Sequence, residues 1–367
     1  MPRKKIIHLQ VLPILSGVQN MMLQLLSGLS NDNYDIYVIS SGNGPLVEAV
    51  ESSGWKHITI KTLVRELSYK DFFTAWSLFW ILRRIKPDIV HTHSSKTGFI
   101  GRLISKISRV PRIIHTIHGF PFHQYQPTIV RLFYTMLETF ASFFADYNVF
   151  VNQFEREYAI HKLGFNKKRA ITIYNGIVPL DITKAEPSNK DILSIVSVLR
   201  FSKQKNVLST IEQAVKVVKQ FDNVIFTFIG DGELYAECKA IIEKNNLEDR
   251  IILKGWISDV SIILKDYDVF LLNSLWEGLP ISILEAMSVG LPIICSNIKG
   301  NNELVNSSNG WLVEPYDLCA LEQVIAEILS NRDLLDLKGK ESLIKVTNQF
   351  HYDLFISEYL RIYENNP

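Results

Sequence analysis

Short apolar runs alternate with longer amphipathic segments along the entire chain. In the first half, apolar runs rich in Ile and Val predict buried strands at residues 6–12, 35–40, 57–60, 88–91, 112–116, 148–151 and 171–174. The segments between these runs have apolar residues at helical spacing, and they predict helices at 18–29, 46–53, 71–85, 97–108, 128–145 and 153–163. Strands that alternate with helices form a parallel sheet covered on both faces.

The same alternation starts again after residue 191. It predicts strands at 193–199, 224–229, 251–254, 269–272, 292–295 and 310–313. It predicts helices at 207–220, 234–245 and 260–265, after Pro280, and from residue 318 to the end. Residues 179–191 are polar, contain two prolines and have no periodicity, which indicates a linker. We therefore expect an N-terminal domain at 1–178, a C-terminal domain at 192–350, and a last helix within 351–367 that packs back on the N-terminal domain. The predicted fold class is α/β, with two tandem doubly wound domains that face each other across a ligand-binding cleft.

Charge is distributed unevenly over a chain whose net charge is only +1. Residues 1–183 contain 21 Lys and Arg against 12 Asp and Glu, whereas residues 184–367 contain 18 against 26. The near-neutral total gives no indication of a nucleic-acid partner, and the two opposite halves indicate domains with different partners. The three scattered cysteines form neither a disulfide framework nor a metal-binding pattern, which favours a reducing cytoplasm.

The first residues are basic and then apolar, as in a signal peptide. His8, Gln10 and Pro13 interrupt the apolar run, and no small-residue cleavage site follows, so we predict a first strand instead. No segment has the roughly 18 uninterrupted apolar residues that a membrane span requires. We expect a cytoplasmic protein.

The stretch 273–290, NSLWEGLPISILEAMSVG, follows a predicted strand and contains two glutamates, Glu277 and Glu285. Glu277 lies in a loop that ends in Gly278, Leu279 and Pro280. Pro280 suits the first turn of a helix, and that helix would carry Glu285. Free N–H groups at a helix start bind phosphate oxygens, and carboxylates accept hydrogen bonds from sugar hydroxyls. The stretch therefore predicts a site for a ligand that is part diphosphate and part polyol.

Two cations, Arg200 and Lys205, lie in the loop that follows the first strand of the second domain. They could form a solvated basic turn, or they could neutralise a diphosphate and its leaving-group charge. The helix-start site predicted in the same domain favours the second interpretation.

Two other short motifs are weaker. Gly230-Asp231-Gly232 lacks the third glycine of a nucleotide fingerprint, so we interpret it as a tight turn. Asp266-Tyr267-Asp268 resembles the Asp-x-Asp of metal-dependent sugar transferases, but it precedes a buried strand and is explained by capping. We predict no bound metal.

Histidines gather at two predicted strand ends in the first domain, as His91-Thr92-His93 and as His115 to His118. No neighbouring carboxylate or cysteine completes a metal-ligand set. His118 precedes Gly119, where a backbone can approach a ligand closely, so we predict a functional role for it. For His91, His93 and His115 we predict structural or supporting roles.

The predicted helices at 71–85 and 128–145 are rich in aromatic residues, and the first ends in Arg83 and Arg84. Such helices either pack on the sheet or lie on a membrane surface. The basic charge of this half would attract anionic lipid, so we expect peripheral membrane contact.

Together, these motifs resemble the retaining glycosyltransferases of the GT-B fold, the large bacterial "group 1" family. Glu277 and Glu285 match its E-x7-E motif, and Arg200 and Lys205 match its phosphate-binding pair. The other matches are Lys254-Gly255-Trp256 at the nucleobase-side strand end, His118-Gly119 in the catalytic loop, Asn175-Gly176-Ile177 before the linker, and Gly17 in the N-terminal loop. The segment 117–123, IHGFPFH, is similar to that of capsule and O-antigen glycosyltransferases, whose acceptors are lipid diphosphates.

The resemblance implies sugar transfer from a nucleotide diphosphate sugar with retained configuration and without a metal or other cofactor. The N-terminal domain would then serve the acceptor and the C-terminal domain the donor. Arg200, Lys205 and the helix start after Pro280 would stabilise the departing diphosphate. Glu277 would hold sugar hydroxyls, Glu285 the ribose, and His118 the donor sugar near the reacting carbon. A UDP-linked hexose or N-acetylhexosamine is the expected donor, and a lipid-linked saccharide at the inner face of the inner membrane is the expected acceptor.

The sequence departs from the family pattern at three places. Ser16-Gly17 replaces a paired glycine, Val178 replaces an Asp, and Gly300-Asn301 replaces a double glycine. These differences concern the acceptor loop and sugar contacts more than the diphosphate site. A GT-B nucleotide-sugar 2-epimerase and a non-catalytic sugar-nucleotide-binding protein remain alternatives. A dinucleotide-dependent oxidoreductase is disfavoured, because Gly-x-Gly-x-x-Gly is absent after the first strand.

Overall fold

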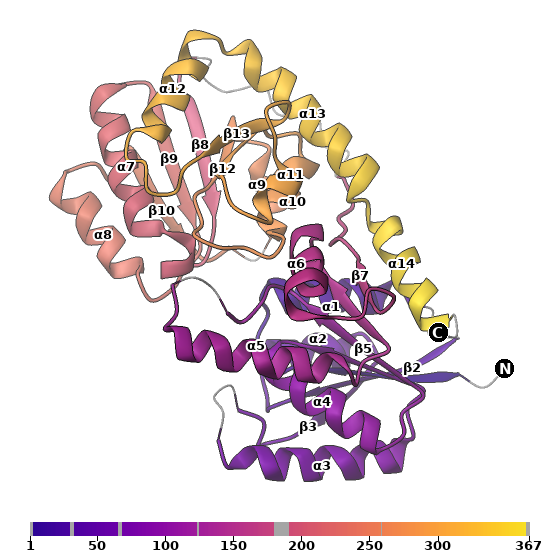
Figure 1. The fold of residues 1–367 in the computed structure, drawn as a ribbon. Helices are drawn as coiled ribbons and strands as arrows, with labels where there is room; N and C mark the ends of the chain where they lie inside the picture. The colour runs from indigo at the N-terminus through magenta and orange to yellow at the C-terminus, as the bar shows by residue number, and fades with distance from the viewer. Residues whose placement is uncertain are drawn as a thin grey trace. The chain divides into compact units, whose positions relative to one another are not determined.

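The computed structural model describes residues 3–29, 33–64, 68–122, 125–179, 191–257 and 259–364. The chain divides into two compact units, shown in Figure 1. The N-terminal unit comprises Met1–Asn175 and Asp353–Pro367, and the C-terminal unit comprises Gly176–Tyr352. Most of the predicted linker lies outside the described residues.

The N-terminal unit contains a seven-stranded sheet of order β3-β2-β1-β4-β5-β6-β7, in which all neighbouring strands are parallel. Its strands are β1 (Lys4–Leu9), β2 (Tyr34–Ser40), β3 (Lys56–Thr59), β4 (Ile89–His93), β5 (Arg112–Ile117), β6 (Tyr147–Phe150) and β7 (Ala170–Thr172). Its helices are α1 (Gly17–Ser27), α2 (Pro45–Ser52), α3 (Lys70–Ile85), α4 (Ser95–Ile107), α5 (Thr128–Ser142) and α6 (Gln153–Leu163). The order reverses between β1 and β4, which makes this the switch point of the sheet.

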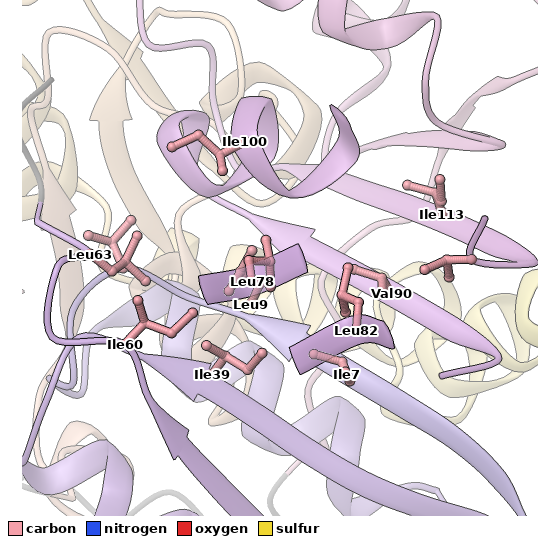
Figure 2. Close-up of a cluster of buried hydrophobic side chains, with 12 residues drawn as sticks. Ile7, Leu9, Ile39, Ile60, Leu63, Leu78, Leu82, Val90, Ile100 and Ile113 are labelled. Atoms are coloured by element: carbon pink, nitrogen blue, oxygen red, sulfur yellow. The ribbon is translucent and has the colours of Figure 1, made fainter. Parts of the chain in front are cut away.

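A hydrophobic core fills the space between this sheet and helices α3 and α4 (Figure 2). Its members include Ile7, Leu9, Ile39, Val90 and Ile113 from the sheet, Leu78 and Leu82 from α3, and Ile100 from α4. Successive strand residues point to opposite faces, so His8, between Ile7 and Leu9, points away from this core. The same alternation places the side chains of His91 and His93 on the face that His8 occupies.

The C-terminal unit contains a six-stranded parallel sheet of order β10-β9-β8-β11-β12-β13. Its strands are β8 (Leu193–Val198), β9 (Val224–Ile229), β10 (Ile251–Gly255), β11 (Val269–Leu272), β12 (Ile293–Ser296) and β13 (Gly310–Val313). Its helices are η1 (Lys203–Lys205), α7 (Val207–Gln220), α8 (Tyr235–Lys244), α9 (Ser261–Leu264), α10 (Ile281–Ser288), α11 (Asn301–Leu304), α12 (Ala320–Ser330) and α13 (Asp333–Gln349). Here the switch point lies between β8 and β11.

The last helix, α14 (Tyr352–Glu364), packs on the sheet of the N-terminal unit, to which its residues from Asp353 onward belong. Arg112 of β5 donates to the carbonyl of Ile362 at 2.5 Å, and the hydroxyl of Tyr34 on β2 donates to Glu364 at 3.5 Å. The burial of Phe355, Tyr359, Ile362 and Tyr363 makes this helix part of that unit's core.

The predicted fold class of two tandem doubly wound domains is confirmed, and the differences are local. Helix α5 ends at Ser142, three residues before the predicted end. Helix α1 begins at Gly17, one residue before the predicted start, because Ser16 is already its extended N-cap residue. The four-residue helix α11 was not predicted.

Candidate functional site

Three residues of the predicted donor site, Arg200, Lys205 and Glu277, follow β8 or β11, the two strands at the switch point of the C-terminal unit. Lys205 ends the short helix η1 after β8, and Glu277 lies in the loop after β11. The Lys205 Nζ atom lies 2.5 Å from Glu277 Oε1, and the exposed fractions of these side chains are 17% and 7%. A shielded pair of this kind is held more firmly than one in open solvent.

The backbone holds these two loops together beside the ion pair. Leu275 donates its N–H to the carbonyl of Gln204 at 2.8 Å, and the Gln204 side chain donates to the carbonyl of Trp276 at 2.9 Å. Gln204 therefore holds the loop of Glu277 against η1 through both its backbone carbonyl and its side-chain amide. Sequence reasoning missed Gln204, because an amide in a polar loop carries no recognisable pattern.

Helix α10 begins just after this loop and carries Glu285, as the sequence predicts. Pro280 is the N-cap residue in an extended conformation, so the expectation that it lies within the first helical turn was wrong by one position. Ile283 and Leu284 donate to the Pro280 carbonyl at 3.2 and 3.4 Å. The N–H groups of Ile281 and Ser282 thus have no intrahelical acceptor, and they give the helix start a positive potential.

Glu285 is half-buried near this helix start. Burial, helped by the negative charge of Asp259, raises the pKa of its carboxyl to about 7. Leu279 and Pro280 are buried, whereas Gly278 is partly exposed. The helix start therefore follows two buried apolar residues, and it carries a carboxyl group whose charge changes near neutral pH.

Arg200 lies in the loop between β8 and η1, where its side chain is 64% exposed. It pairs with Glu233 at 3.1 Å. Glu233 follows the turn Gly230-Asp231-Gly232, and both glycines have positive φ. A Cβ at Gly230 would lie 1.9 Å from the Leu199 carbonyl oxygen, so this turn is a close backbone contact with the loop of Arg200.

The departure at Gly300-Asn301 has a structural explanation. Gly300 has φ +94°, and a Cβ there would lie 2.3 Å from the carbonyl oxygen of Gly278. Asn301 is buried and donates to the hydroxyl of Ser296 at 3.0 Å, and that hydroxyl donates to the carbonyl of Ser274 at 2.6 Å. Asn301 thus stabilises the loop of Glu277 through Ser296 and Ser274, a contact that the sequence does not predict.

Two further positions lie at opposite ends of the sheet. Gly255 ends β10 with φ +70°, its carbonyl accepts from the N–H of Gly230, and Trp256 beside it is 70% exposed. Asp268 is at the other end, directly before β11, where its carboxylate accepts from the N–H and the hydroxyl of Ser194, both at 2.8 Å. The carboxylate of Asp268 therefore has a structural role.

In the N-terminal unit, His118 follows β5 and is partly exposed. Its Nε2 lies 3.0 Å from Nδ1 of His93, and burial lowers the pKa of His118 to about 4. Gly119 after it has φ +132°, in the region that favours glycine. Gly17, by contrast, is an exposed residue at the start of α1.

His91 and His93 on β4 lie with His8 of β1 in a cluster of stacked and tilted rings. His115 lies on the other face of the sheet, where its ring contacts Thr92. Burial lowers the pKa values of all four histidines, so these rings are neutral at neutral pH.

Comparison with known proteins identifies the class. Residues 181–344 match the family "Glycosyl transferases group 1", and residues 15–179 match "Glycosyltransferase Family 4". The chain belongs to the group 1 glycosyltransferases, and its two Rossmann-like units form the GT-B fold.

Individual relatives cover almost the whole chain. It is 36% identical over 365 residues to the UDP-Gal:alpha-D-GlcNAc-diphosphoundecaprenol alpha-1,3-galactosyltransferase of Escherichia coli, covering 95% of this chain and 93% of that one. It is 23% identical to the capsular polysaccharide biosynthesis glycosyltransferase CapM of Staphylococcus aureus, covering 99% and 97%. Among solved structures, Anabaena HepE in complex with UDP and glucose has a TM-score of 0.82 at 17% identity, covering 98% and 99%.

No helix in the described ranges is both long enough and apolar enough to cross a membrane.

Proposed function

We propose that this glycosyltransferase moves a hexose or an N-acetylhexosamine from a UDP-sugar to a lipid-diphosphate-linked saccharide, with retention of the anomeric configuration. The name of the Escherichia coli relative includes UDP-Gal and a diphosphoundecaprenol acceptor. The 36% identity over nearly the full length supports the same classes of donor and acceptor here. UDP-galactose is therefore the first donor to test, and bacterial surface polysaccharide is the proposed product pathway.

The observation that carries this proposal is the Lys205–Glu277 pair beside the start of α10. An ammonium group has three donors, so Lys205 can hold a phosphate oxygen while it keeps its bond to Glu277. The N–H groups of Ile281 and Ser282 add two further donors for the diphosphate. Arg200, on its exposed loop, can exchange Glu233 for a phosphate, because an exposed ion pair contributes little.

In this proposal each carboxylate binds hydroxyl groups. The second oxygen of Glu277 accepts from the transferred sugar, and Glu285 accepts from the ribose. A Cβ built at Gly255 would meet no atom within 4 Å, so there is space at the end of β10 for the uracil ring. His118 and Gly17, in the N-terminal unit, would contribute the sugar and acceptor-loop contacts that the family pattern assigns to them.

Retention would follow from attack on the same face of the sugar, with the departing phosphate assisting the acceptor hydroxyl. Lys205, Arg200 and the helix start would stabilise the charge that develops on the diphosphate. These groups supply the positive charge that a metal would otherwise provide, so we propose a metal-independent reaction.

The acceptor side of the proposal rests on two helices of the N-terminal unit. Exposed apolar residues follow one spacing on both: Tyr69, Phe72, Phe73, Trp76 and Trp80 at α3, and Ile129, Leu132, Phe133, Met136 and Phe140 on α5. Helix α4 packs against both of them, so the three form one layer. The acidic residues of these two helices are paired with cations, Asp71 with Lys96 and Glu138 with Arg102. We propose that this layer lies on the inner face of the inner membrane, where the lipid-linked acceptor is found.

The deciding experiment incubates the purified chain with radiolabelled UDP-galactose and a synthetic N-acetylglucosamine-diphospho-lipid in the presence of EDTA. We expect label in the lipid fraction and an α-linkage by NMR of the product. UDP-glucose, UDP-N-acetylglucosamine, UDP-N-acetylgalactosamine and GDP-mannose serve as competing donors. An epimerised donor in the absence of acceptor would establish the 2-epimerase, and UDP-sugar binding without any turnover would establish the non-catalytic alternative. Product with inverted configuration, or activity only without EDTA, would refute the corresponding part of the proposal.

A further inference from the structure

A buried chain of hydrogen bonds connects His118 to the last helix of the protein. From His118 it passes to His93 at 3.0 Å, and from His93 Nε2 to His8 Nδ1 at 3.0 Å. His8 Nε2 lies 3.3 Å from the hydroxyl of Tyr363 on α14, and that hydroxyl lies 2.6 Å from His91 Nδ1.

The chain ends on a second tyrosine of α14. His91 Nε2 lies 2.7 Å from the hydroxyl of Thr116 on β5, and that hydroxyl lies 2.8 Å from the hydroxyl of Tyr359. All of its members except His118 are buried. Every member lies in the N-terminal unit, so the chain depends on no contact between the two units.

The proton positions in this chain are restricted. A neutral imidazole has one donor and one acceptor nitrogen, whereas a hydroxyl has one proton and can accept two bonds. All links therefore run in one direction, unless Thr116 or Tyr363 accepts from both of its neighbours and leaves its own proton outside the chain. The burial that lowers the pKa of His8 to about 3 and that of His118 to about 4 keeps the imidazoles neutral.

The buried hydroxyl protons distinguish these arrangements. If Thr116 donates to Tyr359, the phenolic proton of Tyr359 has no acceptor among the described residues, and if Thr116 or Tyr363 accepts twice, its own proton has none. If Tyr359 donates to Thr116 and every further link runs the same way, every buried proton has an acceptor, and the far end of the chain is the partly exposed His118. A buried donor without an acceptor is costly, so this last arrangement is favoured.

We propose that Tyr359 and Tyr363 of α14, acting through Thr116, His91, His8 and His93, fix His118 as the tautomer with its proton on Nδ1. His93 then donates to Nε2 of His118, and the Nδ1–H of His118 is a hydrogen-bond donor and not a base. This inference rests on the proposed function in one respect, namely that His118 contacts the donor sugar. Tyr359 and Tyr363 are positioning residues, since they reach His118 only through the chain.

Three of the same histidines could instead ligate a metal, since ligand atoms of His8, His91 and His93 lie within 4.8 Å of one another. However, both ring nitrogens of each of the three already take part in the hydrogen bonds described above. A metal would have to displace these bonds, and no carboxylate of the described residues completes the ligand group. The hydrogen-bond chain is therefore the better explanation of the cluster.

The test measures the tautomer directly. Protein labelled with ¹⁵N in its histidine rings is examined by NMR at pH 7, and the His118 signals are assigned with the variant His118→Gln. We expect Nδ1 protonated and Nε2 unprotonated in the wild type. A predominant Nε2–H tautomer at His118, or stoichiometric zinc in elemental analysis of the purified chain, would overturn the proposal whether or not the chain transfers galactose.

Two variants cut the chain at different places. Tyr363→Phe separates His8 from His91, and Thr116→Val separates Tyr359 from His91. We expect both to give a mixture of His118 tautomers. Turnover should fall about tenfold, as it does when a metal-bound histidine loses the hydrogen bond that orients it, with little change in donor KM. Tyr34→Phe is the matched control, because it removes a buried hydroxyl that bonds to Glu364 of the same helix but lies outside the chain. If Tyr34→Phe lowered turnover equally, or if the cut variants kept a single Nδ1–H tautomer, the positioning role would be refuted.

Discussion

Lys205 and Glu277 are 72 residues apart in sequence, yet their side chains form a 2.5 Å ion pair in the C-terminal unit. Strands β8 and β11 are neighbours in a parallel sheet, so the loops that follow them meet at one edge. A cation for phosphate and a carboxylate for sugar hydroxyls are thereby held together before any donor binds. Preorganised charges of this kind lower a barrier without reorganisation during the reaction.

The first prediction concerns this pair. Lys205→Met should lower kcat/KM for the UDP-sugar by about 100-fold, because a preorganised charge that stabilises the leaving group is lost. Glu277→Gln should lower it as well, and the double variant should be less impaired than the product of the two single effects. Steady-state kinetics over a range of donor concentrations measures all three. Lys203→Met is the matched control, since Lys203 is an exposed cation on the same short helix, and its substitution should leave kcat/KM unchanged. Strictly additive effects would show that the two residues act independently.

A pH dependence of donor binding follows from Glu285. With its pKa raised to about 7, the carboxyl is largely protonated at pH 6 and largely ionised at pH 8. Because the ionised form is the better acceptor for ribose hydroxyls, donor KM should fall as pH rises through 7. The variant Glu285→Gln should show a higher KM without this transition. Asp259→Asn removes a negative charge that raises this pKa, so its KM transition should move to lower pH. A transition that stayed in place in Asp259→Asn would contradict the assignment to Glu285.

The same raised pKa affects stability with a definite sign. Between the ordinary glutamate value and 7, the folded chain keeps a proton on Glu285 that the unfolded chain releases. This group therefore destabilises the fold progressively as pH rises through that window, and its contribution is constant above it. Glu285→Gln should remove this component, so the change of Tm from pH 5 to pH 8 in thermal melts should be more favourable in the variant than in the wild type.

The elements around the site could largely be predicted from the sequence, because their patterns are strong. Strand Val269–Leu272 and helix Val207–Gln220 have the predicted bounds, since continuous apolar residues and amphipathic spacing leave little choice there. Glu277 and Glu285 lie on the predicted loop and helix for the same reason. Boundaries failed where capping decides them, as at Gly17 and Pro280.

Contacts between distant segments could not be predicted in the same way. Nothing in the local sequence of Tyr363 indicates a bond to His91, which is 272 residues away. Both residues have ordinary patterns of buried elements, and only the return of α14 to the N-terminal unit joins them. Asn301 is similar, since its buried amide donates to the hydroxyl of Ser296, and this contact becomes visible only in three dimensions.

The buried histidines predict that the protein loses stability in mild acid. In the unfolded chain they take up protons below about pH 6.5, whereas burial keeps them neutral in the folded chain. Each such histidine destabilises the fold by about 1.4 kcal/mol per pH unit below that value, until its own lowered pKa is reached. Calorimetry from pH 7 to pH 5 should show a falling Tm. His115→Gln should have a lower Tm at pH 7 but a shallower pH dependence, whereas His161→Gln, at a 69% exposed side chain, should match the wild type. A Tm that stayed constant to pH 5 would contradict this reasoning.

A buried ion pair supports the helix layer of the N-terminal unit. Arg102 of α4 is fully buried and donates to Glu138 of α5 at 2.8 Å, to Asn148 at 3.2 Å and to the Gly98 carbonyl. Glu138→Ala would leave a buried guanidinium without its counter-charge, so it should cost about 3–5 kcal/mol in free energy of unfolding. The double variant Arg102→Leu with Glu138→Leu should be less destabilised than Glu138→Ala alone. Chemical denaturation followed by circular dichroism measures both variants, and equal losses would mean that packing and not charge is decisive.

The apolar residues on α3 and α5 give the last prediction, which concerns membrane binding. Trp76 and Trp80 are 59% and 56% exposed, and Arg83 and Arg84 follow at the end of the same helix. Vesicles that contain phosphatidylglycerol should therefore bind the protein in sedimentation assays, and the double variant Trp76→Ser with Trp80→Ser should bind much less. Replacing Arg83 and Arg84 by Gln should weaken binding about fivefold per charge at low salt, since each basic residue near an anionic surface contributes about 1 kcal/mol.

Leu337→Ser is the matched control, because it removes a 59% exposed apolar residue from α13 of the C-terminal unit. Turnover of a short water-soluble acceptor should be unchanged in the α3 variants, since none of these residues belongs to the proposed site. If the α3 variants bound vesicles as well as wild type, these exposed aromatic residues would not be the membrane contact, and the acceptor would have to reach the enzyme by another surface.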